Sequence, residues 1–266
     1  CHNEAHKLTS TRREKANHSI LTQDNWTTVR SLIKQRWSPE QVSGWLKTHP
    51  ELGFYVSDQW VYNYIYADRA QGGDLYTYLR RAGKPYKKGG KQQYRGKIKD
   101  RIDISARPDI INKRLRVGDW EVDSVIGRMN KDSIVTIVER VTRYTSIVKV
   151  DSKESEHVCS SIVKNMGATS LPIYSMTGDN GTEFSAHKNI SEGLHLDFYF
   201  THPYSSWEKG TNENTNGLIR QYFPKGTEFD TISESMLNQV QTALNNRPRK
   251  CLGYKTPAQA MSDWAH

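Results

Sequence analysis

The order of the apolar segments between residues 120 and 246 constrains the fold most strongly. Three successive segments are rich in Val, Ile and Thr and are separated by turn residues, so they predict strands at residues 120–125, 133–139 and 143–150. Helical and strand patterns then alternate, with strands at residues 173–177 and 196–201 and helices at residues 152–166, 185–193, 206 or 211 to 222, and 233–246. This order predicts a mixed five-stranded α/β sheet with helices on both of its faces.

Residues 22–82 carry the start signals of three short helices. Thr22, Ser38 and Ser57 can each cap a helix, and the Pro after Ser38 suits the first helical position. Three helices at this spacing predict a small all-α helix-turn-helix domain, whose last helix would enter the major groove of DNA. The candidate groove residues are Ser57, Gln59, Trp60 and Asn63. A plain three-helix bundle is the alternative, in which the aromatic side chains of this helix would be mostly core, namely Trp60, Tyr62, Tyr64 and Tyr66.

The positive charge of the chain is concentrated in one stretch. The formal net charge is +9, and residues 80–101 hold ten Lys or Arg against one acid, Asp100. Such a block repels itself and stays extended unless a polyanion neutralises it. We therefore predict an N-terminal arm over residues 1–21, a basic linker over residues 83–112, and contacts to DNA phosphates from Lys87, Lys88, Lys91 and Arg95. A solvated linker is the alternative, and one segment can be both.

Composition narrows the class of protein. No run approaches the roughly 18 apolar residues of a membrane span, and no signal peptide is visible, so we expect a cytoplasmic protein without a membrane partner. The three cysteines are odd in number and far apart, which favours reduced thiols over a disulfide framework or a zinc site. The chain begins at Cys1 without an initiating Met, which suggests that an N-terminal piece has been removed.

Three acidic residues fall where the predicted sheet can bring them together. Asp179 follows the strand at residues 173–177, and Asp123 lies in the strand at residues 120–125, which can pair beside it. Glu213 lies at the start of a polar helix that can cross the same edge of the sheet. Ligand sites in such sheets form at the carboxyl ends of the strands, so the three acids are candidates for one site.

Three carboxylates in one place repel one another unless cations neutralise them. Mg²⁺ prefers carboxylate and phosphate oxygens, and two such ions about 3.5–4 Å apart can promote an in-line displacement at phosphorus. We therefore predict that Asp123, Asp179 and Glu213 hold two divalent ions for phosphodiester chemistry on DNA. Taken singly, each acid has an ordinary explanation as a turn, surface or helix-start residue. Glu121 and Glu208 also compete for the role.

Several blocks of the sequence together resemble one family. The blocks are Asp-Asn-Gly-Thr-Glu-Phe at 179–184, His-Pro-Tyr-Ser-Ser-Trp-Glu-Lys-Gly at 202–210, Asn-Glu-Asn at 212–214, Gly-Asp-Trp-Glu-Val-Asp at 118–123, and those at 37–46, 222–226 and 246–254. They resemble the integrase-like DDE transposases, in particular the insertion sequence 30 family. The resemblance covers roughly residues 37–261, which is nearly the whole chain.

This resemblance implies a ribonuclease H-like catalytic domain, here over residues 113–266, that uses Mg²⁺ or Mn²⁺. It implies Asp123 and Asp179 as metal ligands and favours Glu213 over Glu208 as the third. It also implies binding of double-stranded DNA at terminal inverted repeats, cleavage of the donor end by water, and attack of the freed 3′-hydroxyl on target DNA. Family members usually carry a further N-terminal helix-turn-helix, whereas about twenty residues precede Thr22 here, so we expect end recognition to be incomplete.

The same blocks supply candidates for contacts around the acids or with DNA. The candidates near the acids are Asn180, His202, Trp207 and Asn216, and the candidate phosphate contacts are Arg220, Lys225, Arg247, Arg249 and Lys250, for which a solvated surface is the alternative. Together the patterns predict a DNA transposase that works as a homodimer or a larger assembly. A non-catalytic DNA-binding regulator is the alternative class. The presence of all three acids argues against it, because binding alone needs no cluster of negative charge.

Overall fold

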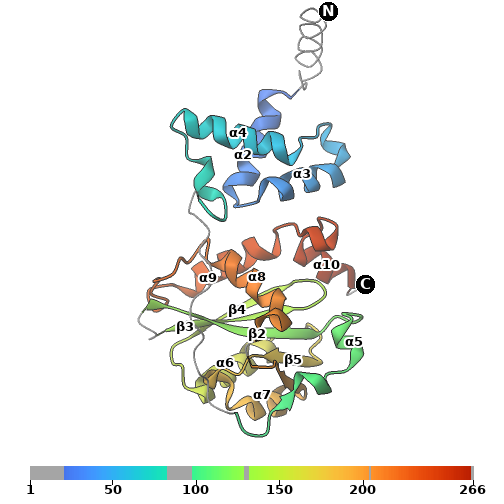
Figure 1. Cartoon of the computed structure of the whole chain (residues 1–266), viewed down its shortest axis with the longest axis vertical. Helices are drawn as coiled ribbons and strands as arrows, with labels where there is room; N and C mark the ends of the chain where they lie inside the picture. Colours follow the sequence, from blue (N-terminus) through green and yellow to red (C-terminus); the bar gives the residue numbers. More distant parts are fainter. Residues whose placement is uncertain (1–20, 83–97, 129–131, 204, 265–266) are drawn as a thin grey trace, which may run out of the picture. The chain divides into compact units, whose positions relative to one another are not determined.

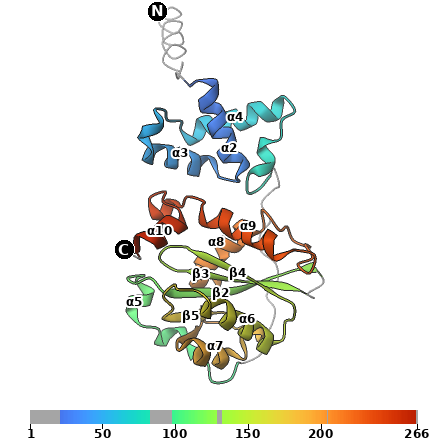
Figure 2. The same cartoon turned by 180° about the vertical axis from the view of Figure 1, so that it is seen from behind.

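The structure is a computed structural model that describes residues 21–82, 98–128, 132–203 and 205–264 (Figures 1 and 2). The chain divides into two compact units, Cys1–Ala82 and Gly83–His266. Almost all of the predicted arm lies outside the described residues. So do the candidate phosphate contacts of the basic linker, Lys87, Lys88, Lys91 and Arg95. Within the described ranges, no helix combines the length and apolarity that a bilayer crossing requires.

The described part of the first unit is built on three α-helices, α2 (Gln23–Lys34), α3 (Pro39–Thr48) and α4 (Asp58–Ala70), with short 3₁₀ helices at Pro50–Leu52 and Leu75–Tyr78. Each α-helix begins where its cap was predicted. The side chains of Thr22, Ser38 and Ser57 each accept the backbone N–H of the residue three positions on. Apolar side chains from all three helices form one buried core, which includes Val29, Ile33, Val42, Leu46, Val61 and Ile65.

The outer face of α4 carries most of the candidate groove residues. Gln59, Trp60 and Asn63 are exposed, and the Gln59 amide donates to the side-chain oxygen of Asn63 at 3.1 Å. Trp60 is 40% exposed, so the alternative that places its ring in the core is wrong. Tyr64 of the same helix does face inward, where its ring stacks on Trp26. Contact between this face and DNA stays a prediction.

The strands of the second unit form a six-stranded sheet in the order β1-β6-β5-β2-β3-β4. Their bounds are β1 (Ile102–Asp103), β2 (Asp119–Ile126), β3 (Ser133–Glu139), β4 (Thr145–Val150), β5 (Ser175–Gly178) and β6 (Asp197–Phe200). Strands β2, β3 and β4 pair antiparallel, whereas β1, β6, β5 and β2 pair parallel. All five predicted strands form, and the predicted mixed α/β class is confirmed.

The sheet has six strands where five were predicted, and the additional strand also shortens the predicted linker. Strand β1 is only two residues long, too short for a periodic pattern, and it lies inside the segment predicted as a basic linker. The predicted linker is therefore too long at its C-terminal end. Ile98, Ile104 and Ile111 are buried, and residues 109–112 form the short helix α5 (Asp109–Asn112). These residues fold as part of the second unit.

Helices cover both faces of this sheet, as predicted (Figures 1 and 2). One face carries α6 (Ser155–Gly167) and α7 (His187–Leu194), with a 3₁₀ turn at Thr182–Phe184 before α7. The other carries α8 (Gly210–Ile219) and α9 (Glu234–Asn245), and α10 (Pro257–Trp264) packs beside α9. Further 3₁₀ turns lie at Ile104–Ala106, Ser206–Lys209 and Lys250–Leu252.

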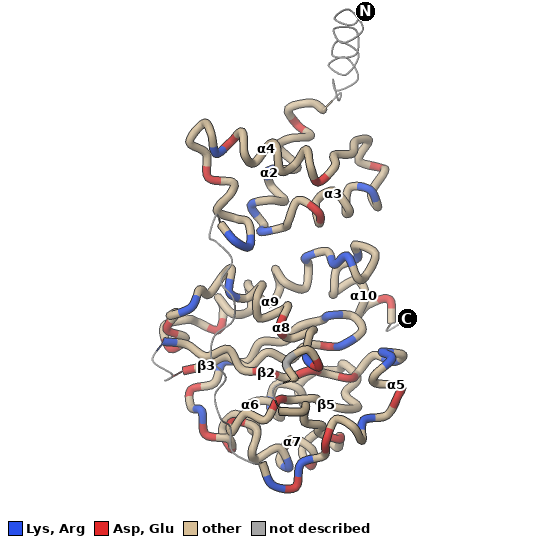
Figure 3. Tube along the Cα trace, in the orientation of Figure 1, with Lys and Arg blue, Asp and Glu red and all other residues tan. Residues whose placement is uncertain are grey.

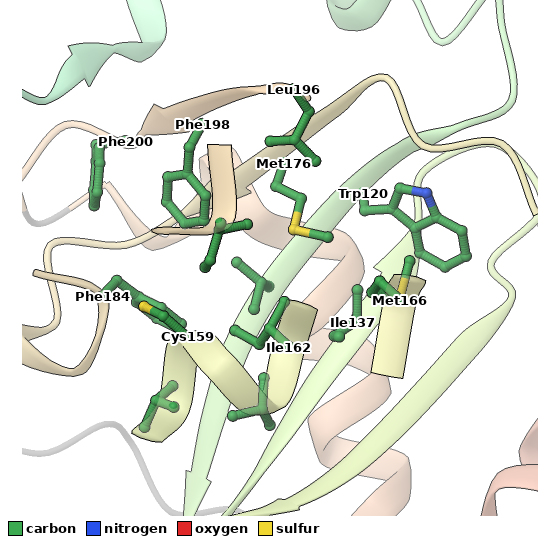
Figure 4. Packing of buried hydrophobic residues seen from close by; sticks show 14 of the residues in the cluster. Trp120, Ile137, Cys159, Ile162, Met166, Met176, Phe184, Leu196, Phe198 and Phe200 are labelled. Carbon is green, nitrogen blue, oxygen red and sulfur yellow. The ribbon is translucent and has the colours of Figure 1, made fainter. Parts of the chain in front are cut away.

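The side chains of β2 alternate between these two faces. Trp120 and Val122 join a buried cluster with residues of α6 and β6, and Figure 4 shows Trp120 among these core side chains. Val125 instead packs with Leu218 of α8. Because side chains two apart on a strand share a face, Glu121 and Asp123 lie on the α8 side with Val125. The packing of the core thus fixes which acids of β2 face this helix.

Gly118 shapes the start of β2. Its φ is +111°, its carbonyl accepts the N–H of Tyr174 at 2.7 Å, and a Cβ there would lie 2.6 Å from the Tyr174 ring. A side chain at this position would meet both a disfavoured backbone conformation and a clash.

We predict that Gly118→Ala lowers the free energy of unfolding by roughly 2–4 kcal/mol, because backbone strain and the clash add. Gly210→Ala is the matched control. A Cβ at Gly210 would meet nothing within 4 Å at the start of α8, so this change should alter stability by less than about 1 kcal/mol. Denaturant unfolding measures both variants, and equal losses would contradict the prediction.

Candidate active site

Asp123 and Asp179 lie next to each other at the carboxyl end of β5. In the parallel pairing of β2 with β5, Glu121 is opposite Thr177, so Asp123 and Asp179 each follow this pair by two residues. The ammonium of Lys209 lies 3.0 Å from Asp123 Oδ1 and 3.7 Å from Asp179 Oδ2. The structure therefore brings together two of the three predicted acids, around a shared cation.

Lys209 is the residue that sequence reasoning missed. It ends the 3₁₀ turn Ser206–Lys209 directly before α8, and its side chain is only 7% exposed. Its Nζ also donates to the backbone oxygen of Val122 at 3.3 Å. Burial works to lower the pKa of Lys209, but Asp123 and Asp179 outweigh it and raise that pKa, so the side chain stays charged. The sequence does hold one indication of this role: Lys209 precedes Glu213 by four residues, which is about one helical turn.

Asn216 holds the other oxygen of Asp123. Its Nδ2 donates to Asp123 Oδ2 at 2.7 Å, and its Oδ1 accepts from the hydroxyl of Thr136 at 2.9 Å. Thr136 stands opposite Asp123 in the β2–β3 pairing. Both oxygens of the Asp123 carboxylate are thus fixed by groups from α8 and the turn before it, so this acid is held in one orientation.

Glu213 does not join the two aspartates in this conformation. It is exposed in the first turn of α8, and within the described ranges its side chain makes no hydrogen bond or ion pair. No group of three His, Cys, Asp or Glu among the described residues could hold a metal ion. Asp123 and Asp179 do fit a hard cation, because a buried ammonium already lies between them. Glu213 stands one helical turn before Asn216, which touches Asp123.

The two competing acids are engaged elsewhere. Glu121 is fully buried, pairs with Arg140 Nη1 at 2.7 Å and accepts the backbone N–H of Asn212 at 3.2 Å. Glu208 accepts the backbone N–H of His202 at 2.8 Å and lies 2.7 Å from the ring Nδ1 of the same residue. Both carboxylates therefore hold the start of α8 and the loop before it.

His202 and Asn180 join the loops around the site. Besides Glu208, the His202 ring approaches Asp103 through Nε2, at 3.1 Å. Asn180 is buried; it donates to the carbonyl of Thr201 at 2.7 Å and accepts from the Arg101 guanidinium. These contacts connect β1 to the loops that follow β5 and β6. They give both residues a structural role, whereas their contact with DNA stays a prediction.

The remaining predicted DNA contacts differ in how exposed their side chains are. Trp207 is 73% exposed, and Lys225 and Lys250 are exposed, so all three are accessible to DNA. Arg220 donates to the backbone oxygen of Ile126 at 2.8 Å, and burial lowers its pKa.

Two predicted phosphate contacts are corrected. Arg247 is 2% exposed and donates to Gln221 Oε1 at 2.6 Å. Arg249 is 6% exposed and donates to the carbonyl of Leu244 at 3.1 Å. Their guanidinium groups lie in the interior, where a DNA phosphate has no access to them.

The pKa of His202 is raised by its hydrogen bond to Glu208. A raised pKa in the folded state stabilises the protein fully below the unfolded value of about 6.5, and this stabilisation is lost as pH rises through the folded pKa. We predict that His202→Gln lowers the melting temperature more at about pH 5.5 than at about pH 9. An NMR titration of the ring should show a pKa above about 6.5 that falls in Glu208→Gln. A melting-temperature difference independent of pH would contradict this assignment.

We predict that Lys209→Met lowers the free energy of unfolding of the metal-free protein by roughly 1–3 kcal/mol, because it leaves two carboxylates facing each other without their cation. Added Mn²⁺ should reduce this loss, since a divalent ion can neutralise the same pair. Lys255→Met is the control, because Lys255 forms a surface pair with Asp263 and should matter little. Unfolding with and without Mn²⁺ measures both, and a loss that Mn²⁺ leaves unchanged would argue against the shared site.

Comparisons with known proteins place the chain in a family. No protein-family model matches the chain. The transposase for insertion sequence element IS4351 of Bacteroides fragilis is 41% identical over 247 residues, which is 92% of this chain and 75% of that protein. The transposase InsI for insertion sequence element IS30A of Escherichia coli strain K12 is 36% identical over 236 residues, which is 85% of this chain and 61% of that protein.

Among solved structures, the catalytic core domain of BIV integrase matches 56% of this chain and 95% of that chain, with a TM-score of 0.43 and 20% identity. That likeness is distant, and no site residue is assigned from it. The chain therefore belongs to the transposases of the insertion sequence 30 family.

Proposed function

We propose that this protein is a metal-dependent DNA transposase that cuts DNA at the ends of its element and joins the freed 3′-hydroxyl to target DNA. The observation that carries the proposal is the pair Asp123 and Asp179, two carboxylates at the carboxyl end of β5 that lie around one buried cation. Two carboxylates at this spacing can bind a cation. In a chain related to transposases over most of its length, phosphodiester chemistry is the function that it supports best.

Asp123 and Asp179 would hold the metal, which we propose to be Mg²⁺ or Mn²⁺ as two ions, with Glu213 as the third acid. Bound ions of this kind supply charge stabilisation to a phosphodiester that undergoes in-line displacement. The chain's own part is to orient the acids. Asn216 fixes one oxygen of Asp123, and Lys209 neutralises the pair until an ion replaces it.

The DNA partner would meet both units of the chain. On the first unit we propose that the exposed face of α4, with Gln59, Trp60 and Asn63, reads the major groove. On the second unit the exposed side chains of Trp207 and Lys225 are accessible for contacts with DNA. Pairing two DNA ends requires at least a homodimer, and the place of action would be the cytoplasm, where prokaryotic DNA lies. A non-catalytic regulator would not need two acids arranged around a cation.

We predict that Asp123→Asn and Asp179→Asn each reduce metal-dependent cutting and joining by at least about 100-fold, because each removes a metal ligand. The substrate is a plasmid that carries the terminal inverted repeats of the element, assayed with Mg²⁺. Asp263→Asn, which removes an exposed acid paired with Lys255, is the matched control and should keep full activity.

Binding to the same ends in Ca²⁺, followed by fluorescence anisotropy, should change by less than about threefold in both variants, because the DNA contacts remain. Full activity in both aspartate variants would disprove the metal-site assignment. DNA binding by the wild-type chain without any divalent-dependent cutting would favour the regulator instead.

A further inference from the structure

Two arginines from separate turns meet on one hydroxyl at the start of α8. Arg114 follows α5, and its Nη2 donates to Thr211 Oγ1 at 3.2 Å. Arg143 lies in the turn between β3 and β4, and its Nη1 donates to the same oxygen at 2.9 Å. Thr211 is the second residue of α8, two positions before Glu213. Two guanidinium groups therefore share one small neutral acceptor.

This group of positive charge has no carboxylate of its own. Within the described residues, neither Arg114 nor Arg143 has an Asp or Glu oxygen within 4.0 Å, and the nearby Glu121 is already paired with Arg140. Elsewhere in the second unit Lys and Arg mix with Asp and Glu (Figure 3). Burial, and after it the charges of Arg143 and Arg140, lower the pKa of Arg114. Like charges at this spacing repel unless an anion joins them.

The backbone at both arginines is unusual. Arg114 has a φ of +54° and Arg143 a φ of +64°, a left-handed conformation that favours Gly or Asn. The Arg143 turn is closed by the carboxylate of Glu139, which accepts the backbone N–H of Val141 at 2.8 Å and the hydroxyl of Thr142 at 2.7 Å. Positions of this kind persist only where the surrounding structure holds them, and they are often found at functional sites. Here both side chains point to the same place.

That place is close to the candidate active site. The N–H of Asn212, next to Thr211, is bonded to Glu121, which stands two residues before Asp123 on β2, about 6.6 Å along the strand. The buried side-chain amide of Asn212 has no hydrogen-bond partner among the described residues. The N-terminal end of α8 adds its own partial positive charge. An anion bound here would lie near Asp123, about two residues back along β2.

We propose that Arg114 and Arg143 together bind one backbone phosphate of the DNA strand that passes Asp123 and Asp179. This inference rests on the proposed function and adds a contact that positions the strand. Two guanidinium groups provide several N–H donors for the oxygens of one phosphate. A phosphate carries no base identity, so this contact supports every sequence alike.

The test measures binding of the full chain to a short fluorescent duplex of arbitrary sequence in Ca²⁺, over about 50–200 mM salt. Arg114→Gln with Arg143→Gln should weaken binding by about tenfold and lower the salt slope by about 0.9, the value for one phosphate. Lys113→Gln removes a neighbouring charge whose side chain is 63% exposed and pairs with Asp109. As the control it should change binding by less than about twofold.

Two further measurements separate phosphate binding from a structural role. If both arginines hold one phosphate, the loss in the double variant should be smaller than the product of the two single losses. Arg143→Gly relieves the left-handed backbone, so it should keep the melting temperature within a few degrees while binding weakens. A double variant that binds DNA like Lys113→Gln overturns this inference alone. A wild-type chain that neither binds nor cuts DNA overturns the proposed function with it.

Discussion

The ammonium of Lys209 lies between Asp123 and Asp179, and the arrangement of this edge of the sheet depends on it. Asp123 in β2 and Asp179 directly after β5 would otherwise destabilise each other, because both side chains are largely buried and carry the same charge. The cation comes from the turn directly before α8. The ion pairs therefore also fix where this helix begins over β2.

A second ion pair also holds the start of α8, and its acid lies two residues before Asp123 on β2. Glu121 is paired with Arg140, which directly follows β3, and it accepts the backbone N–H of Asn212 in the first turn of α8. Asn216 adds a contact one turn further, to Asp123. The acids of β2 thus hold α8 at successive points. An ion that displaced Lys209 would act on the segment that also carries Glu213 and Thr211. The proposed metal site and the proposed phosphate contact therefore share one segment of the chain.

Local chemistry explains why much of this fold could be predicted from the sequence. The caps at Ser38 and Ser57 use only residues within one helical turn, and the alternation in β2 follows from burial of Trp120 and Val122 on one face. The adjacency of Asp123 and Asp179 follows from pairing the strands that carry them. Each of these inferences needs only a short window of sequence and one rule of pairing.

The features that could not be predicted depend on distant contacts. A lysine in a polar segment is solvated by default, and only the closeness of two carboxylates from other strands makes burial of Lys209 favourable. Arg247 fails as a phosphate contact for the converse reason, because the packing of α8 and α9 encloses it beside Gln221. Arg114 and Arg143 lie 29 residues apart in the sequence, so no local pattern relates them. Their side chains meet at Thr211 only in the folded second unit, just as Asp123, Asp179 and Lys209 do at the candidate active site.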